Sequence, residues 1–280
     1  MEKLYFYLRH FIKAKDEHSI HSPFIFALYC DVICSKASYY AFDEIEKLRE
    51  SLENNQQKIT FEDLGAGANN SKIQSKTTLK TTSVGQIARN SAKSPRLAQI
   101  LFRLVNYFQP KNLLDLGTSL GITTAYLAKA SAKTNIISFE GDTTISEIAK
   151  QNFEKLNINN VSIITGNLNK TLSKCLKKHF ENKKNNNIDN NNDIDNSLDF
   201  VFFDANHQYL PTISYFETFL PYTHENTVFI FDDIYWSEGM ANAWKTIKNH
   251  PKTRQTIDLY WFGIVFFRQN QEKESFILRI

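Results

Sequence analysis

Acidic residues end several apolar segments along the chain, and they are the first candidates for chemistry. They are Asp115 in KNLLDLG, Glu140 in NIISFEG, Asp204 in LDFVFFDA, and Asp232 and Asp233 in NTVFIFDD. Carboxylates that lie close together repel one another, and burying them without partners costs free energy. Solvent and helix N-termini are one compensation; a divalent cation is another, because hard oxygen ligands suit Mg²⁺ or Ca²⁺. The carboxylates favour the cation and leave the first alternative open.

His207 follows Asp204 closely, in the stretch FVFFDANHQY. Histidine is the side chain whose ordinary pKa lies nearest neutral pH, so it can serve as a general base. A structural or substrate-binding histidine fits the same position equally well. The sequence therefore leaves the role of His207 open between these alternatives.

Two similar glycine turns compete for a cofactor-binding role, DLGAGAN at 63–69 and DLGTSLG at 115–121. Such a turn must follow a buried strand and open a helix, so that the helix N-terminus and bare backbone face the ligand. An acidic residue should end the next strand, about 20 residues on, to hold ribose hydroxyls. DLGTSLG meets these conditions, since two leucines precede it, a helix-forming run begins at Ile122, and Glu140 follows.

DLGAGAN has more glycine but lacks this setting. Its strand is short and polar, no helix opens after Ala68, and no acidic residue ends a following strand. We interpret it as a tight turn in which Gly65 and Gly67 supply positive φ angles. The alternative is that it begins a polar lid, roughly 65–93, over an acceptor site.

The spacing of the working turn also separates classes of cofactor. Dinucleotide-binding turns place a glycine where the backbone meets the pyrophosphate. Here the turn reads Gly117-Thr118-Ser119-Leu120-Gly121, so a side chain occupies that position. This favours a cofactor without a pyrophosphate and disfavours a nicotinamide dehydrogenase.

Strands and helices alternate from residue 111 onward, and this order positions the candidate residues. Apolar strands in such an alternation predict a parallel sheet that is covered on both faces. Ligands of these sheets lie outside the carboxyl ends of the strands, where the acidic residues stand. Near the end of the chain, TIDLYWFGIVFFR and ESFILRI leave no room for a helix between them. We therefore expect these two segments to form a hairpin, with one antiparallel strand at the end of the sheet.

The segment before this alternation has a different character. The pattern predicts helices in the aromatic-rich residues 1–60, a short strand at KITFED and a polar loop at ANNSKIQSKTTLKTTS. A helix then begins at Ser94 and Pro95, which suit its first positions. We expect an N-terminal extension over 1–93, a main domain over 94–280, and a surface loop in the Asn/Asp-rich segment 183–196.

The segment LLDLGTSLGITTAYLAKA resembles the first motif of the class I S-adenosylmethionine-dependent methyltransferases. Its G-T-x-x-G form is similar to the catechol and caffeoyl-coenzyme A O-methyltransferase branch. The resemblance covers roughly 94–280. It implies a Rossmann-like α/β fold with a seven-stranded, mostly parallel sheet whose C-terminal strand is antiparallel. It also implies methyl transfer from S-adenosylmethionine to a small hydroxylated acceptor, and a homodimer.

The resemblance further implies site residues. Relatives carry D-A-D-K-x-N-Y and D-N-x-L-W-x-G motifs whose metal ligands fall on Asp204, Asp232 and Asp233, where this chain has DANHQY and DDIYWSEG. The implied ion is Mg²⁺, Mn²⁺ or Ca²⁺. Asp233 replaces an asparagine of the relatives, and His207 replaces their catalytic lysine, so metal dependence and a catalytic His207 are hypotheses. The expected cofactor-binding residues are Asp115, Gly117, Thr118, Ser119, Gly121, Glu140, Gly166, Asn167 and Asp204, with Asn167 placed near the adenine by the resemblance alone.

The composition limits the classes of partner that we expect. The net charge is +3, from 33 basic and 30 acidic residues, which argues against a nucleic-acid partner without excluding it. Three cysteines make a disulfide framework improbable. Because no stretch of about 18 apolar residues exists, we expect no membrane partner and a cytoplasmic protein.

Two other functions remain as alternatives to methylation of a small acceptor. One is methylation of an RNA hydroxyl, and the other is a non-catalytic binding protein that retains the fold. Tyr235, Trp236, Tyr260 and Trp261 could wall an aromatic acceptor pocket, although ordinary core packing is the favoured interpretation. The sequence does not identify the acceptor.

Overall fold

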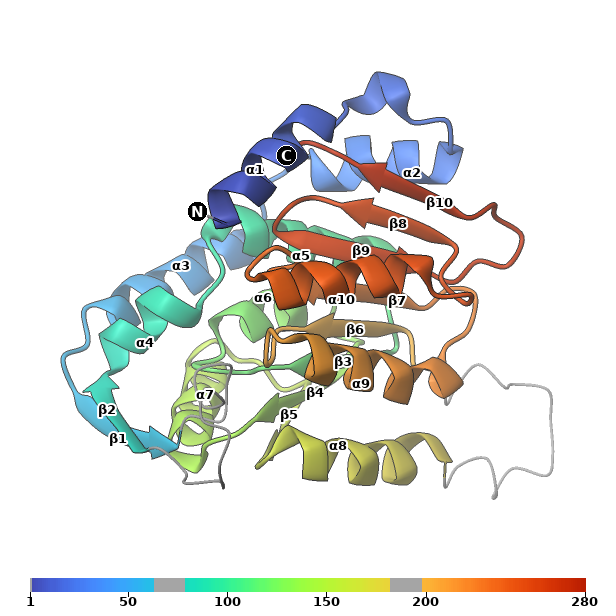
Figure 1. Cartoon of the computed structure of the whole chain (residues 1–280). Helices are drawn as coiled ribbons and strands as arrows, with labels where there is room; N and C mark the ends of the chain where they lie inside the picture. The colour runs from blue at the N-terminus through green and yellow to red at the C-terminus, as the bar shows by residue number, and fades with distance from the viewer. Residues whose placement is uncertain (1, 63–78, 182–197) are drawn as a thin grey trace. The chain divides into compact units, whose positions relative to one another are not determined.

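The computed structural model describes residues 2–62, 79–181 and 198–280 (Figure 1). These residues pack into two compact units. Of the described residues, unit 1 comprises 2–34, 112–114, 173–181 and 198–280, and unit 2 comprises 35–62, 79–111 and 115–172. The expected division after residue 93 stays a prediction. DLGAGAN and the Asn/Asp-rich segment lie outside the described residues, as does the first part of the expected lid, 65–78.

The strands of unit 1 are mostly parallel, as the sequence predicts. They follow the order β10-β8-β9-β7-β6, and the first residues of β3 come next to β6. Strands β6 and β7 are parallel, whereas β9 is antiparallel to both of its neighbours, β7 and β8. The bounds are β3 (Asn112–Leu116), β6 (Phe200–Phe203), β7 (Val228–Asp232), β8 (Gln255–Asp258), β9 (Phe262–Phe266) and β10 (Glu274–Ile277).

The expected hairpin between the last two segments is wrong. TIDLYWFGIVFFR itself forms the hairpin of β8 and β9, and β10 pairs with β8 in parallel. The antiparallel strand is therefore β9, and β3 to β10 number eight strands among the described residues rather than seven. Tyr260 makes the turn with φ of 70°, and its N–H donates to Asp258 Oδ1 at 3.2 Å. Tyrosine is not a typical turn residue, so the sequence carries no signal for this break.

The helices of unit 1 cover its strands with aromatic packing. The inner face is rich in phenylalanine, and the rings of Phe203 and Phe231 stack at 4.1 Å between centroids. Trp244 of α10 lies against Gly263 of β9, where a Cβ atom would approach the indole to 2.7 Å. In Figure 1, α9 and α10 run beside β6 and β7. The helices are α1 (Glu2–Lys13), α2 (Pro23–Leu28), α9 (Tyr209–Phe219) and α10 (Glu238–Asn249).

Unit 2 contains the predicted strand–turn–helix series. Strand β4 pairs in parallel with β5, and helix α5 begins after Ser94 with Pro95 at its first position. Helix α6 is buried along almost its whole length. The bounds are α3 (Tyr40–Glu53), α5 (Pro95–Phe108), α6 (Ile122–Ala130), β4 (Asn135–Glu140), α7 (Thr143–Lys155) and β5 (Val161–Thr165), with α8 (Leu168–Leu176) beginning in this unit.

Part of the expected polar loop before residue 94 is a β-strand. Its last residues form β2 (Leu79–Ser83), which pairs antiparallel with β1 (Lys58–Glu62), and α4 (Val84–Ser91) follows. Strand β2 is largely exposed. Without a buried face it has no apolar alternation, so its pairing could not be predicted from pattern.

None of the described helices is both long and apolar enough to cross a lipid bilayer.

Candidate active site: a glycine turn and a carboxylate–histidine cluster

The turn after β3 has the backbone that its glycines predict. Gly117 and Gly121 have φ of 130° and 83°, and Ser119 adopts 48°. Gly121 precedes the first residue of α6, and a Cβ atom there would lie 2.7 Å from the Phe153 ring. Glycine is therefore required at 121 by both conformation and space. The turn presents the N-terminus of α6, which favours an anionic or polar ligand group.

Glu140 ends β4 and is hydrogen-bonded to this turn. Its Oε2 accepts from Ser119 N–H at 2.8 Å, and its Oε1 accepts from Asp142 N–H at 3.1 Å. Burial raises the pKa of the Glu140 carboxyl, although these backbone hydrogen bonds act in the opposite direction. A carboxylate offers about four acceptor positions, so these hydrogen bonds leave room for a ribose hydroxyl. The predicted pairing of turn and acid is present within unit 2.

Asp115 lies beneath the turn and is only 1% exposed. Its Oδ2 accepts from Thr124 Oγ1 and from Ser138 Oγ, each at 2.7 Å. Ser138 also exchanges a hydrogen bond with Thr118. These contacts orient the turn. Sequence analysis did not single out Thr124 and Ser138. The signal that could have revealed them is a small hydroxyl side chain inside an otherwise apolar helix or strand.

Gly166 and Asn167 follow β5 and lie beside the same edge of unit 2. Gly166 N–H donates to the Glu140 carbonyl at 2.8 Å, and its φ is 125°. Asn167 Oδ1 accepts from Asn169 N–H at 3.0 Å, which starts α8. The structure thus brings Gly166 next to Glu140, and gives Asn167 a local capping contact.

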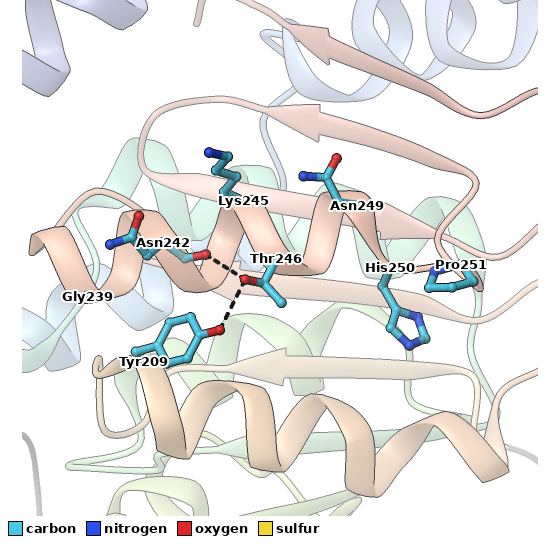
Figure 2. Close-up of a pocket in the computed structure, with 8 residues that line it drawn as sticks. All are labelled: Tyr209, Gly239, Asn242, Lys245, Thr246, Asn249, His250 and Pro251. Atoms are coloured by element: carbon cyan, nitrogen blue, oxygen red, sulfur yellow. Dashed lines mark hydrogen bonds between the residues drawn. The ribbon is translucent and has the colours of Figure 1, made fainter.

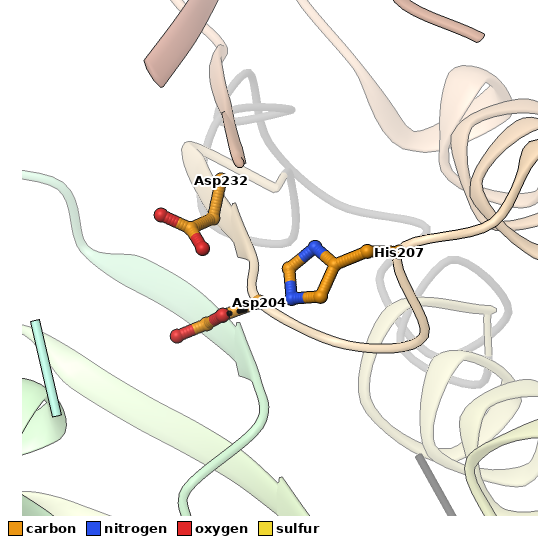
Figure 3. A group of neighbouring side chains, drawn as sticks. All are labelled: Asp204, His207 and Asp232. Atoms are coloured by element: carbon orange, nitrogen blue, oxygen red, sulfur yellow. Dashed lines mark ion pairs between the residues drawn. The ribbon is translucent and has the colours of Figure 1, made fainter. Parts of the chain in front are cut away.

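Unit 1 holds a cluster of possible metal ligands, Asp204, His207 and Asp232 (Figure 3). One ligand atom from each lies within 4.8 Å of the others, and His207 Nε2 lies 3.4 Å from Asp204 Oδ1. Asp232 is buried, whereas the other two are partly exposed.

This donor set fits a divalent cation. Ligands about 2.1 to 2.4 Å from an ion are separated from one another by no more than about 4.8 Å. Two carboxylates and an imidazole suit Mn²⁺ or Zn²⁺ as well as Mg²⁺. Asn206 stands in the same loop with φ of 51°, and its Oδ1 is buried without a hydrogen-bond partner among the described residues. A buried acceptor of this kind suits a bound ion or a water held by that ion.

Asp233, the third ligand expected from the sequence, does not belong to the cluster of described residues. Its φ is 50°, and its N–H donates to the Trp261 carbonyl at 2.8 Å. Strand β7 ends at Asp232, so Asp233 has already left the extended backbone that places Asp232 in the cluster. His207 takes the place in the cluster that Asp233 was expected to hold.

A second buried carboxylate, Asp258 at the end of β8, was missed by sequence analysis. Its Oδ2 accepts from Tyr235 Oη at 2.6 Å and from Trp244 Nε1 at 2.9 Å, while His10 Nε2 lies 3.3 Å from Oδ1. Burial alone would raise the pKa of the Asp258 carboxyl, but the hydrogen bonds from these partners and the charge of Lys248 lower it. This group joins α1 to the segment that follows β7.

Some of the aromatic residues near the cluster are exposed to solvent and do not pack in the core. Trp236 and Trp261 are 50% and 44% exposed, so the favoured core-packing interpretation is wrong for both. The Trp236 ring lies 6.5 Å from that of His207, whereas Tyr235 stacks on Tyr260 at 5.6 Å. An exposed indole therefore stands beside a candidate ligand.

A separate pocket lies between α9 and α10, with a volume of about 780 Å³ (Figure 2). Tyr209 Oη and Thr246 Oγ1 are 3.3 Å apart across it. Burial lowers the pKa of His250, which lies 3.6 Å from Glu217. None of the site residues expected from the sequence lines this pocket. Its lining is Tyr209, Gly239, Asn242, Lys245, Thr246, Asn249, His250 and Pro251.

Comparison with known proteins finds a family match within the chain. Residues 114–234, which include the glycine turn and the cluster, match the family model of a methyltransferase domain. A search of curated proteins finds no match.

Solved structures share the fold at low sequence identity. A methyltransferase from Podospora anserina bound to S-adenosylhomocysteine has a TM-score of 0.56 and 13% identity over 89% of this chain and 98% of its own. An O-methyltransferase from Bacillus cereus, also in complex with S-adenosylhomocysteine, has a TM-score of 0.50 and 19% identity over 85% and 94%.

Residues 114–234 therefore resemble a methyltransferase domain. The resemblance to the class I S-adenosylmethionine-dependent methyltransferases is confirmed, and the fold is the one found in their O-methyltransferase branch.

Proposed function

We propose that this protein transfers the methyl group of S-adenosylmethionine to an oxygen atom of a small hydroxylated acceptor, assisted by a divalent cation. The observation that carries the proposal is the Asp204–His207–Asp232 cluster in a chain with a methyltransferase domain. When bound, S-adenosylmethionine supplies an electrophilic methyl group on a sulfonium. What remains for the protein is to align an oxygen with that methyl group and to favour its deprotonated form.

The residues of unit 2 would hold the cofactor. Glu140 accepts a hydrogen bond from the ribose hydroxyls, because its backbone partners do not fill its acceptor positions. Gly117 and Gly121 let the backbone approach the methionine portion, because neither carries a side chain. Thr118 and Asp115 hold the turn in this form through Ser138.

The residues of unit 1 would hold the cation. A cation bound by Asp204, His207 and Asp232 would lower the pKa of an acceptor hydroxyl and orient it. We assign His207 to the ligand set because its Nε2 approaches Asp204 so closely. The general-base role, which the sequence left as one of two open hypotheses, is the competing assignment, since a nitrogen that binds a cation does not accept a proton.

Activity in the presence of a chelator tests the proposal. We expect transfer of labelled methyl from S-adenosylmethionine to a set of small hydroxylated compounds, loss of transfer with EDTA, and recovery with Mg²⁺ or Mn²⁺. Turnover that resists the chelator would exclude the cation. Transfer to RNA alone, or cofactor binding without transfer to any acceptor, would favour the two alternative functions.

One variant distinguishes His207 as a ligand of the cation from His207 as a general base. As a ligand, His207→Ala should weaken Mn²⁺ binding, measured by electron paramagnetic resonance, together with turnover. As a base, the same variant should lose turnover while binding Mn²⁺ as the unaltered protein does. S-adenosylmethionine binding should stay intact in either case, which shows that the variant is folded.

A further inference from the structure

The helix α1 is amphipathic in an unusual sense, because its apolar face points away from the unit to which it is attached. Leu4, Leu8 and Ile12 recur at a spacing of four and share one face, with Tyr5 and Phe11 beside them. All five are at least half exposed, and Ile12 reaches 80%. No residue of α1 is buried. Side chains that normally form a core here face solvent.

The opposite face of α1 fixes this orientation. His10 lies 3.3 Å from the buried carboxylate of Asp258, and Phe6 stacks on Tyr235 at 5.4 Å. Near the start of the helix, Lys3 Nζ lies 3.1 Å from the centre of the Trp236 ring. Rotating α1 to bury its apolar face would break these contacts and leave Asp258 without one of its partners. The outward apolar face is therefore built into the docking of α1.

Positive charge borders this face. Arg9, Lys13 and Lys15 are exposed along or just beyond α1, and the Arg279 guanidinium lies 5.2 Å from the Phe11 ring. Within the helix Glu2 is the only acid, while Asp16 and Glu17 follow its end. An exposed stripe of aliphatic and aromatic residues with cationic borders is the pattern of a helix that lies in a lipid headgroup layer.

The area and the charges of the apolar face of α1 argue against a second copy of the chain as its binding partner. A helix of 12 residues is about 18 Å long and about 10 Å wide, so one side presents a footprint of roughly 200 Å². A stable protein interface buries about 800 Å² on each partner. Pairing two copies through α1 would also bring their cationic borders together. An anionic lipid surface has neither disadvantage.

We propose that the outer face of α1 docks this protein on anionic lipid surfaces. Leu4, Leu8 and Ile12 insert among the acyl chains near the headgroups, and Arg9, Lys13, Lys15 and Arg279 contact lipid phosphates. The sequence led us to expect no membrane partner because no spanning segment exists, but a helix lying in the interface needs none. The proposal does not depend on the reaction that the protein catalyses.

Co-sedimentation of the full chain with vesicles tests the proposal. We expect binding to phosphatidylcholine vesicles that contain phosphatidylserine, little binding to phosphatidylcholine alone, and loss of binding at high salt. Ile12→Gln or Leu8→Gln should weaken binding about tenfold or more. Neutralising one cation, in Arg9→Gln or Lys13→Gln, should weaken it about fivefold. Leu210→Gln on α9 removes a leucine that is 75% exposed and lies outside the stripe, so it should bind as the unaltered protein does.

Two results would overturn the proposal. One is absence of binding to phosphatidylserine vesicles at low salt by a chain whose circular dichroism shows it folded. The other is a dimer, seen by analytical ultracentrifugation, that Ile12→Gln dissociates while Leu210→Gln does not. That second result would assign the stripe to a protein interface.

Discussion

The Glu140 carboxylate meets the glycine turn at one end of β4, where a ribose would have to bind. Because its two oxygens accept backbone hydrogen bonds from Ser119 and Asp142, it orders the turn before any cofactor arrives. Pre-ordering of this kind lowers the entropy lost on binding. The same residue therefore has a structural task and a proposed binding task.

Replacing Glu140 should weaken the binding of S-adenosylmethionine. Glu140→Ala removes the acceptor for ribose hydroxyls, and a lost hydrogen bond to a charged group is worth about 1.5 to 3 kcal/mol. We expect S-adenosylmethionine to bind roughly ten- to a hundredfold more weakly in calorimetry. Glu147→Ala, an exposed position on α7, is the matched control. Unchanged affinity in Glu140→Ala would remove this residue from the cofactor site.

Asp232 and Asp233 offer an unusually close comparison, since only one of two adjacent aspartates lies in the cluster. Asp232→Asn should weaken Mn²⁺ binding at least tenfold, because a ligand charge is lost, whereas Asp233→Asn should change it much less. Titration calorimetry of both variants measures the contrast. Equal losses would restore the ligand set expected from the sequence.

At the scale of elements, Asp258 joins α1 to β8 and to the segment after β7. A buried carboxylate with several donors is stabilising only while its partners are present, and removing one side of such an arrangement typically costs about 3 to 5 kcal/mol. The aromatic contacts of Tyr235 with Phe6 and Tyr260 depend on the same arrangement. The position of α1 is thus coupled to a residue 248 positions away from His10.

Asp258→Asn should destabilise unit 1 and loosen α1. We expect a lower melting temperature and faster amide hydrogen exchange over residues 2–13, while Glu272→Gln in the exposed loop before β10 changes neither. The pKa of Asp258 is lowered in the folded state, so its ionisation stabilises the fold above its unfolded pKa. That contribution is lost as pH falls through the folded pKa. The difference between the two proteins should therefore shrink under acid conditions, and a constant difference would contradict this account.

At the scale of the whole molecule, binding of S-adenosylhomocysteine, the product that remains after methyl transfer, should raise the free energy of unfolding. A ligand that binds only the folded state stabilises it by about 2.7 kcal/mol at a hundredfold excess over its Kd. For a chain of this size, S-adenosylhomocysteine should raise the melting temperature by about 5 to 10 °C. Glu140→Ala should lose this shift at the same ligand concentration. A shift of equal size in the variant would place the ligand elsewhere.

The alternation of apolar strands and helices could be predicted from sequence because burial on both faces leaves continuous apolar runs. The turn could be found for a related reason, since Gly117 and Gly121 adopt positive φ angles that few other residues tolerate. Elements without a buried face escaped prediction. Strand β2 is exposed and polar, and the break between β8 and β9 occurs at tyrosine.

What the sequence determined by itself was local: which segments form the parallel strands, which turn opens a helix, and which acids end the strands. Tertiary structure decided which of those acids meet. Asp232 lies with Asp204 and His207 while its neighbour Asp233 lies outside the group, because β7 ends between the two aspartates and the loop after β6 brings His207 back. It also decided that α1 turns its polar contacts inward, because Asp258, far along the chain, provides the buried charge that His10 meets.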